Sequence, residues 1–357
     1  MPIAGPQAWN EDVSTVSRPL AGLTIIEAAS KGPLALDLAL GLCGRIAADL
    51  GANVIRLSER ADTASDLTKE EIAFLHAGKK RLTASSSQFD HLLQDVCTHA
   101  NALLCDVGLL DHIPLELKLP IASIGMSLEA PMSGSEFTIE ARSGLLDLVG
   151  DPNRQPLRLA GHPLAYTAGT ALYLAMMMGV IEHKAGEKSG PKRVDLLDIG
   201  VWLNWKTLGL AKRGARIPSR EGSASEWFIV PCADGFVALV YRIQEWEALK
   251  QATGDQRLQD ERFATIHQRR EHSKELNAIL SDIFSRKTRA QIRALSLQYK
   301  LPLGPVWTPA ELLTDEHFKH RAFFHPTFFE GQTFPMPRLP VIWNGTAFPP
   351  AEQEQPA

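Results

Sequence analysis

The residues best suited to chemistry gather in the segment 159–169. His162 can transfer protons near pH 7. Tyr166 can donate a hydrogen bond, but its phenol, with a pKa of about 10, is a poor nucleophile. A loop rich in turn-forming residues precedes this segment and a long apolar run follows it, so we expect a helix to begin at Pro163 or Leu164. The pattern indicates acid–base chemistry at a helix start, and a structural role for His162 there is the alternative.

The composition is that of a globular protein with no preference for polyanions. The chain has 357 residues, 45% of them hydrophobic and 22% charged, with a net charge of -4. It lacks a basic stripe, which argues against nucleic acid or a membrane surface as partner. The four cysteines have no CxxC spacing, so no metal site is expected and reduced thiols in the cytoplasm fit best. No signal peptide is expected, and the apolar run 168–181 is shorter than the ~20 residues that span a bilayer.

The first half of the chain alternates short apolar runs with helical patterns. Strands of a parallel sheet are predicted at 23–28, 54–57, 81–84, 102–105 and 120–124. Helices are predicted at 34–50, 69–75, 89–99 and 136–149, followed by the long helix that reaches about residue 184. This alternation predicts a large, doubly wound, Rossmann-like α/β domain over residues 19–215, in which ligands bind beyond the carboxyl ends of the strands.

A smaller α+β domain is predicted over residues 216–325. Its β-hairpin spans 227–230 and 236–241, with Asp234 and Gly235 as the turn signal. Helices are predicted at 243–253, 271–285 and 289–299, a strand at 305–307, and a further helix with Thr308 as N-cap and Pro309 in its first turn. Residues 326–357 are expected to be irregular and to return to the large domain.

Several segments also form a recognisable series. They include PLAGLTIIE at 19–27, CGRIAADLGANVIR at 43–56, HAGKK at 76–80, PVWTPAELL at 305–313 and RAFF at 321–324. In this order they resemble the class III CoA-transferase family, which includes formyl-CoA and carnitine CoA-transferases and the α-methylacyl-CoA racemases. The similarity extends from residue 19 to about residue 348.

The resemblance implies that coenzyme A or an acyl-CoA thioester binds near the domain junction, with a carboxylic acid as second substrate and no metal. It also implies an interlocked dimer, either a homodimer or a heterodimer with a paralogue. In the family's transferases an aspartate attacks the acyl-CoA. A carboxylate suits this step because its acyl products remain activated.

The chain departs from the family at this catalytic position. By alignment the aspartate falls at Ala165, whose methyl group cannot attack a thioester. The neighbours Leu164 and Tyr166 are not acids. The histidine of the racemases falls, by its spacing, at Ser135. The catalytic residue is therefore open, with His162 and Tyr166 as candidates.

Basic residues near strand ends and a glycine turn are candidates for contacts with CoA phosphates, with solvated side chains as the alternative. The predicted cofactor-binding residues are Arg56, Arg60, Lys79, Lys80 and Asp106. Asp106 and Glu140 are also weaker candidates for the catalytic site, and a structural role is the alternative for both.

Three functions remain open and one is rejected. The chain is expected to be a CoA-transferase that uses another nucleophile, a catalytically silent homologue that binds CoA esters or assists a paralogue, or an acyl-CoA racemase-like enzyme. A dinucleotide-dependent oxidoreductase is rejected because no GxGxxG follows the first strand, and Gly41 and Gly44 have the wrong spacing and lie within a predicted helix.

Overall fold

The computed structural model describes residues 17–59, 67–114, 117–151, 153–187, 190–212 and 227–352. The chain divides into two units. The first contains the chain up to Asp147, the part from Leu157 to Arg216 and the part from Glu316 onward, and the second contains Leu148–Pro156 and Ile217–Asp315. Compared with the predicted small domain at 216–325, residues 316–325 group with the first unit, and Leu148–Pro156 groups with the second.

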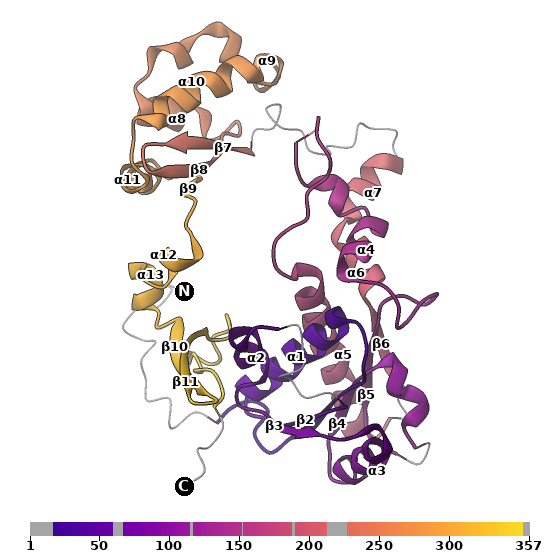
Figure 1. Cartoon of the computed structure of the whole chain (residues 1–357). Helices are drawn as coiled ribbons and strands as arrows, with labels where there is room; N and C mark the ends of the chain where they lie inside the picture. Colours follow the sequence, from indigo (N-terminus) through magenta and orange to yellow (C-terminus); the bar gives the residue numbers. More distant parts are fainter. Residues whose placement is uncertain are drawn as a thin grey trace. The chain divides into compact units, whose positions relative to one another are not determined.

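A six-stranded, all-parallel sheet forms the centre of the first unit (Figure 1). Its strands are β1 (Thr24–Ala29), β2 (Asn53–Ser58), β3 (Lys80–Thr83), β4 (Ala102–Asp106), β5 (Ile121–Gly125) and β6 (Lys192–Asp195). They lie in the order β3-β2-β1-β4-β5-β6, which places the topological switch point between β1 and β4. The five predicted strands are present. The sixth, β6, was not predicted because the sequence KRVD is short and largely polar at the sheet edge.

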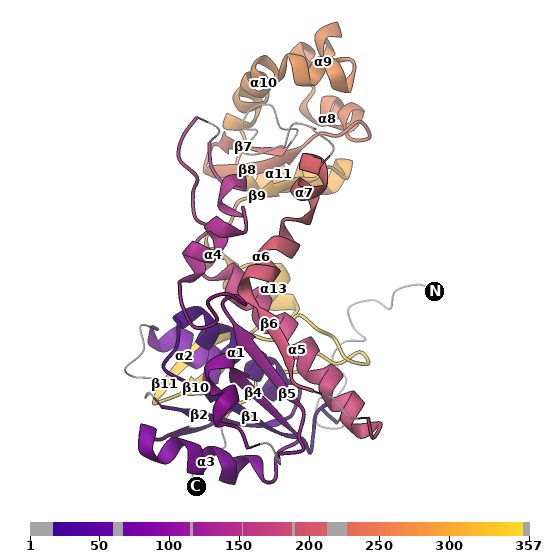
Figure 2. The ribbon, with the colours of Figure 1, turned by 90° about the vertical axis from the view of Figure 1, so that its right-hand side faces the viewer.

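Helices cover both faces of this sheet, as the doubly wound prediction requires. The helices α1 (Leu34–Asp49) and α5 (Pro163–Lys184) share a core cluster with Ile25, whereas α3 (Ser86–Cys97) shares another with Ile26. Consecutive residues of a strand point to opposite faces, so the two isoleucines mark the two faces. Figure 2 shows α1 above the strands and α3 below them.

The long helix α5 packs tightly on α1. By length and composition alone α5 is apolar enough to cross a membrane. Its residues Ala165, Ala168 and Leu172 nevertheless lie in the core cluster of the sheet. A Cβ on Gly169 would approach the carbonyl oxygen of Ala39 in α1 to 2.6 Å, so this contact requires glycine. This packing agrees with the interpretation of the run as a core helix.

The helix predicted at 136–149 ends early. It forms α4 (Glu136–Arg142), followed by a 3-10 turn at Leu146–Leu148. Gly144 has a φ of 78°, a left-handed conformation that favours glycine and commonly follows a helix end. The helices α6 (Leu196–Leu203) and α7 (Trp205–Lys212) follow β6.

The second unit has the predicted α+β composition. Its antiparallel sheet contains β7 (Trp227–Cys232), β8 (Gly235–Val240) and β9 (Leu303–Pro305). Its helices are α8 (Trp246–Thr253), α9 (Ile266–Glu271), α10 (Ser273–Ser285), α11 (Arg289–Tyr299) and α12 (Pro309–Leu312), with 3-10 turns at Gln256–Gln259 and Glu261–Phe263. The hairpin turns at Ala233 and Asp234, one residue earlier than the predicted Asp234–Gly235 turn. Thr308 caps α12 before Pro309, as predicted.

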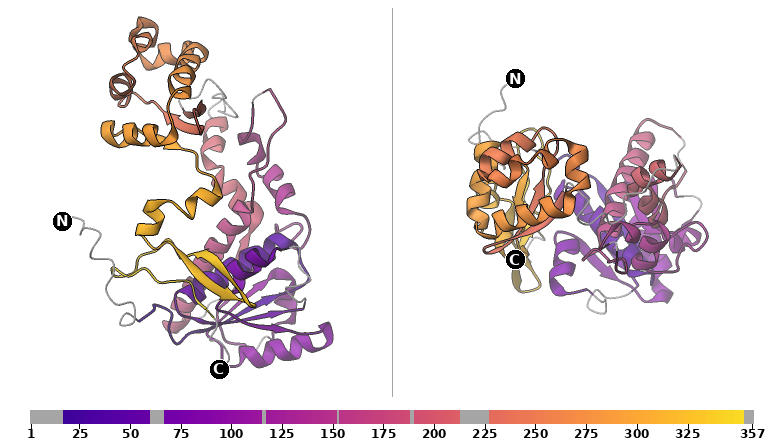
Figure 3. Two further views of the ribbon diagram at one scale, coloured as in Figure 1. Left: turned by 60° about the vertical axis from the view of Figure 1, so that its left-hand side comes forward. Right: turned by 90° about the horizontal axis from the view of Figure 1, so that it is seen from above.

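The prediction of an irregular carboxyl end was wrong. After α13 (Glu316–His320), the strands β10 (Phe324–Phe329) and β11 (Gln332–Pro337) form an antiparallel hairpin. Its side chains Phe329, Phe334 and Met336 pack with Ile72 of α2 (Lys69–His76), which ties this part to the first unit. Figure 3 shows the yellow hairpin beside the indigo and purple helices. The prolines of β11 suggested a loop, but an edge strand tolerates them.

Candidate active site

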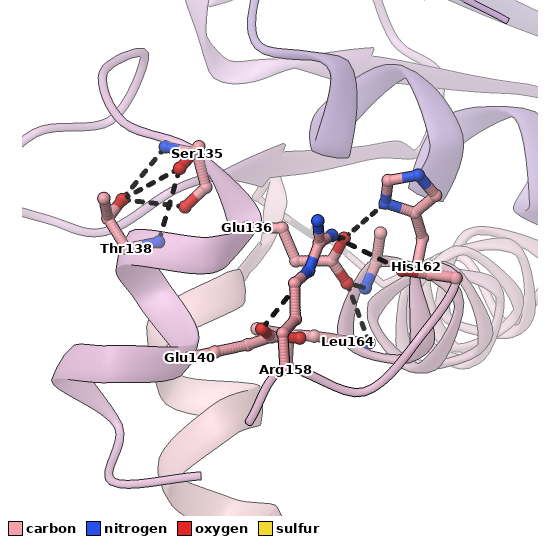
Figure 4. Close-up of polar contacts among 9 residues, drawn as sticks. Ser135, Glu136, Thr138, Glu140, Arg158, His162 and Leu164 are labelled. Carbon is pink, nitrogen blue, oxygen red and sulfur yellow. Dashed lines mark hydrogen bonds and ion pairs between the residues drawn. The ribbon is translucent and has the colours of Figure 1, made fainter. Parts of the chain in front are cut away.

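The site is built on the start of α4. Ser135 is the N-cap: its hydroxyl accepts a hydrogen bond from the backbone N–H of Thr138 at 3.3 Å, and its own N–H donates to Thr138 Oγ1 at 3.0 Å. This capping box fixes the first turn of the helix. Glu136, the next residue, is thereby presented toward the start of α5 (Figure 4). Ser135, where the sequence spacing led us to expect the racemase histidine, thus has a structural role in capping.

The carboxylate of Glu136 caps α5 from outside that helix. Its Oε1 accepts hydrogen bonds from the backbone N–H groups of Leu164 and Ala165, both at 3.0 Å. The first N–H groups of a helix have no partner within the helix, and the helix dipole favours a negative charge there. His162 is the N-cap residue but makes no side-chain cap, so Glu136 takes over this task.

The imidazole of His162 is bound to the same carboxylate. Its Nδ1 lies 2.6 Å from Glu136 Oε2, with side chains that are 23% and 4% exposed, respectively. A carboxylate accepts hydrogen bonds, so the neutral ring carries its proton on Nδ1 and has a lone pair on Nε2. Figure 4 shows the second ring nitrogen on the side away from Glu136. The pair has the orientation of a general base held by a carboxylate.

A second buried carboxylate lies one helical turn further along α4. Burial, and to a smaller extent the negative charge of Glu136, raises the pKa of Glu140 above its ordinary value, while Arg158 opposes the rise. Arg158 spans the two carboxylates: Nη2 lies 3.5 Å from Glu136 Oε2, and Nε lies 3.7 Å from Glu140 Oε2. Glu140 Oε2 has no hydrogen-bond partner among the described residues. The sequence-based candidate Glu140 thus lies beside the pair that contains His162.

The other catalytic candidates lie away from the reactive nitrogen. Ala165 is fully buried in the core, and its backbone serves the cap. Tyr166 packs edge-on against Phe74 at a centroid distance of 6.2 Å. Burial raises the pKa of Tyr166 above its ordinary value, which makes the phenolate less accessible still. Of the two predicted candidates, His162 has the geometry for proton transfer.

The predicted CoA ligands Arg56 and Lys79 lie in the core. Arg56 Nη1 donates to Glu27 Oε1 at 2.6 Å, and Lys79 Nζ donates to Glu27 Oε2 at 2.6 Å and to the carbonyl oxygen of Gly41 at 2.8 Å. A second arginine nitrogen lies 2.7 Å from Asp37 Oδ1. Burial lowers the pKa of Lys79, and the charge of Glu27 opposes this shift. Both cations are therefore neutralised by carboxylates in this fold, and their contacts with CoA stay predictions.

The remaining predicted ligands have different surroundings. Lys80 is exposed on β3, and Arg60 lies outside the described residues. Asp106 is buried at the end of β4, where it accepts hydrogen bonds from the N–H of Ser30 at 2.6 Å, the hydroxyl of Ser30 at 2.9 Å and the N–H of Gly108 at 3.0 Å. Burial raises the pKa of Asp106, and these hydrogen bonds oppose the rise. The environment of Asp106 is that of a loop-stabilising group, and its contact with CoA also stays a prediction.

The sequence interpretation missed Glu136 and Arg158. Glu136 was passed over because nothing local relates it to a histidine 26 residues later. The pattern Ser-Glu-x-Thr at 135–138 was a usable signal, since it indicates a capped helix start that carries an acid in its first turn. Within the described ranges, no group of three or more His, Cys, Asp or Glu side chains is arranged to hold a metal ion.

Comparison with protein families identifies relatives of the chain. The family model described as CoA-transferase family III matches residues 126–357. The alpha-methylacyl-CoA racemase of Mus musculus is 24% identical over 364 residues, covering 94% of this chain and 89% of the mouse protein. The succinate–glutarate CoA-transferase of Agrobacterium fabrum is 26% identical over 388 residues, covering 97% of this chain and 94% of that protein.

Solved structures agree with the fold. A CAIB/BAIF family protein from Brucella suis superposes with a TM-score of 0.78 at 21% identity, covering 96% of this chain and 97% of that one. A hypothetical protein from Mycobacterium tuberculosis superposes with a TM-score of 0.75 at 19% identity, covering 92% and 94%. The fold of this chain is therefore shared with proteins that have only about a fifth of their residues in common with it.

Proposed function

Because the chain belongs to CoA-transferase family III, we propose that it acts on an acyl-CoA thioester by proton transfer, with His162 as the base and Glu136 as its positioning residue. The observation that carries this proposal is the 2.6 Å contact between His162 Nδ1 and Glu136 Oε2. Because this contact occupies Nδ1, the lone pair of the neutral ring is on Nε2, which is the basic atom of the pair. Family membership supports an acyl-CoA substrate, and the geometry of the pair supports proton transfer as the reaction class.

The proposed step is the exchange of the hydrogen next to the thioester carbonyl. The lone pair on His162 Nε2 takes this proton, and the electrons of the C–H bond move into the carbonyl to give an enolate. The negative charge of Glu136 stabilises the imidazolium that forms. The imidazolium then returns a proton to the carbon, so the base is regenerated. A racemase of α-methylacyl-CoA is among the relatives, which supports this reaction class.

The second candidate is CoA transfer to a carboxylic acid, supported by the transferase relative and by the presence of a carboxylate at the start of α5. Glu136 would attack the thioester carbonyl, the C–S bond would break, and CoA would leave as the thiolate, so that a mixed anhydride of Glu136 and the acyl group remains. The thiolate would then attack the glutamyl carbonyl and release the first acid, and the second acid would take the acyl position on CoA by the reverse of these steps. Against this stand the 4% exposure of Glu136 and the hydrogen bonds that occupy both its oxygens. For Glu136 to attack, it would have to give up these hydrogen bonds and become accessible, whereas proton transfer by His162 leaves them in place.

Deuterium exchange tests the proposal. The full-length protein is incubated with acetyl-, propionyl-, 2-methylbutanoyl- and succinyl-CoA in D₂O, and deuterium next to the carbonyl is measured by mass spectrometry. We expect exchange with at least one thioester and a loss of at least ~100-fold in His162→Gln. The matched control is His112→Gln, since His112 also pairs with a carboxylate, Asp90, at 3.0 Å, but at the surface. It should keep the wild-type rate.

Other outcomes select the alternatives. Absence of exchange with every thioester contradicts proton transfer. If hydroxylamine then releases a hydroxamate from Glu136, the chain is a transferase that uses this carboxylate. If neither reaction occurs but calorimetry detects CoA esters, the chain is a silent binding homologue.

A dimer in the cytoplasm belongs to the same proposal. Large apolar side chains are exposed on α5, α6 and α7, which supports a partner surface. They include Leu174, Met178, Ile181, Trp202 and Trp205. All four cysteines are free thiols, as suits the cytoplasm. Light scattering should show that the wild type is a dimer and that the double variant Trp202→Glu, Trp205→Glu is a monomer. If the wild type is itself a monomer, the homodimer is wrong, and a paralogue would have to be the partner.

A further inference from the structure

Arg338 is a buried cation with little to neutralise it. It follows β11, and its side chain is 4% exposed. Its Nη1 donates to the carbonyl oxygen of Leu339 at 2.8 Å, and its guanidinium lies 5.4 Å from the centre of the Phe323 ring. Its Nε is buried without a hydrogen-bond partner, and among residues 17–352 that the structure describes no carboxylate forms an ion pair with it. Leaving a buried charge unpaired is costly, so this arginine requires an explanation.

Other buried arginines of the first unit are paired. Arg45 is equally buried and binds Asp49 through Nε at 2.8 Å. Arg56 binds Glu27 at 2.6 Å and Asp37 at 2.7 Å. The core of this unit thus supplies carboxylates where it buries guanidinium groups. The exception at Arg338 indicates that its counter-charge comes from outside these residues.

More positive charge lies around Arg338. Burial lowers the pKa of Arg338 below its ordinary value, and the nearby charge of Arg321 lowers it further. His325, on β10, is half-buried, and its pKa is lowered first by burial and also by the charge of Arg338. The negative charge of Glu352 acts on His325 in the opposite direction. A bound anion would therefore reduce the electrostatic repulsion among these positive groups.

The backbone holds this cluster in a strained turn. Ala322, between Arg321 and Phe323, has a φ of 43°, which is unfavourable for a residue with a Cβ. Its N–H donates to Lys319 O at 3.0 Å, and the N–H of Phe323 donates to Phe318 O at 3.0 Å. The ring of Phe323 packs against the rings of Phe318 and Phe324. The fold thus fixes the backbone that carries Arg321 and the aromatic ring that supports Arg338.

We propose that Arg338, Arg321 and His325 form a binding site for a phosphate group. Two guanidinium groups match the double charge of a phosphate monoester or of inorganic phosphate, and Arg338, which pairs with no carboxylate among the described residues, gains a counter-charge. Arg321 is exposed and meets an incoming anion first, and His325 can add a third positive charge when the anion binds. The site does not depend on the chemistry proposed for His162.

Inorganic phosphate is the probe for this site. Thermal unfolding and calorimetry of the full-length protein are compared in phosphate and in chloride of equal ionic strength. We expect phosphate to raise the Tm of the wild type, and Arg321→Gln to weaken phosphate binding by roughly tenfold or more. Arg142→Gln is the matched control, since Arg142 is an exposed arginine paired with Glu129, and it should bind phosphate like the wild type.

Arg338→Met separates binding from folding. Without phosphate its Tm should be equal to or higher than that of the wild type, because an unpaired buried charge is removed, and its response to phosphate should be lost. If this variant does not fold, Arg321→Gln alone decides. Equal phosphate binding by the wild type and Arg321→Gln, or no effect of phosphate beyond that of chloride, overturns the proposal.

CoA and dephospho-CoA identify the source of the phosphate. If the 3′-phosphate of CoA is the ligand, the wild type binds CoA more tightly than dephospho-CoA, and Arg321→Gln loses this difference. If free phosphate is the ligand, the two nucleotides bind alike while inorganic phosphate still binds. Both results support the site and assign its occupant.

Discussion

Two charged clusters of the first unit use carboxylates in opposite ways. In the cluster of Glu27, Arg56 and Lys79, one buried carboxylate neutralises two buried cations at 2.6 Å each. In the cluster of Glu136 and His162, the carboxylate satisfies two backbone N–H groups and one half-buried imidazole. The first arrangement pairs its cations with a carboxylate, whereas in the second no described residue binds Nε2 of His162, the atom that we propose as the base. A charged residue is thus informative about function only together with its partners.

Removing the carboxylate of the buried cluster should reduce stability most. Glu27→Leu removes the carboxylate that binds Lys79 Nζ at 2.6 Å in the core, and the same carboxylate binds Arg56. We expect the free energy of unfolding to fall by about 3–5 kcal/mol, measured by urea denaturation. Glu27→Leu combined with Lys79→Met should recover part of the loss. A loss below about 1 kcal/mol would show that this cluster contributes little to the stability of the fold.

A second carboxylate at the start of α5 should be poorly tolerated. Ala165→Asp restores the acid expected from the family, but places it at a fully buried position next to Glu136. We expect a loss of about 3 kcal/mol in the free energy of unfolding, because two like charges and extra volume must share one site. Adding Glu136→Ala should recover part of this loss. If Ala165→Asp alone is as stable as the wild type, a carboxylate at position 165 does not compete with Glu136 for the start of α5.

Gly44→Ala tests how tightly the buried cluster is packed. A Cβ at Gly44 in α1 would collide with Glu27 Oε2 and lie 2.9 Å from Lys79 Nζ. An alanine in a helix normally stabilises by up to about 1 kcal/mol relative to glycine. Here we expect the opposite sign, a loss of about 2 kcal/mol seen in thermal or urea unfolding. A stabilised variant would contradict the close approach of Glu27 to α1.

The smallest effect should come from Glu140, and it should depend on pH. Burial raises the pKa of Glu140 in the folded chain above its ordinary value of 4.5. The unfolded chain therefore loses this proton at lower pH than the folded chain, so wild-type stability falls as pH rises through that interval. Glu140→Gln cannot titrate and should be more stable than the wild type at neutral pH, with a smaller difference below pH 4.5. A difference that is constant across pH would contradict this sign.

Much of the fold could be predicted because its signals are local. Apolar runs of a few residues indicated five of the six strands, and Pro163 marked the first residue of α5. The wrong or missing elements are those whose stability comes from distant partners. The strand β6 pairs with β5, and the hairpin β10–β11 packs on α2, although both have polar or proline-containing sequences.

From sequence alone we could infer the family, five strands of the parallel sheet and the position of His162 at a helix start. Strands and helix starts depend on patterns within short segments, and the family depends on the order of several such segments. Which charged groups meet became visible only in the folded chain. The register of β1 against β2 sets Glu27 beside Arg56, and the packing of α4 on α5 brings Glu136 to His162 across 26 residues. Hydrogen bonds and ion pairs act over about 3 Å, so the role of a charged residue follows from strand register and helix packing rather than from its own sequence neighbourhood.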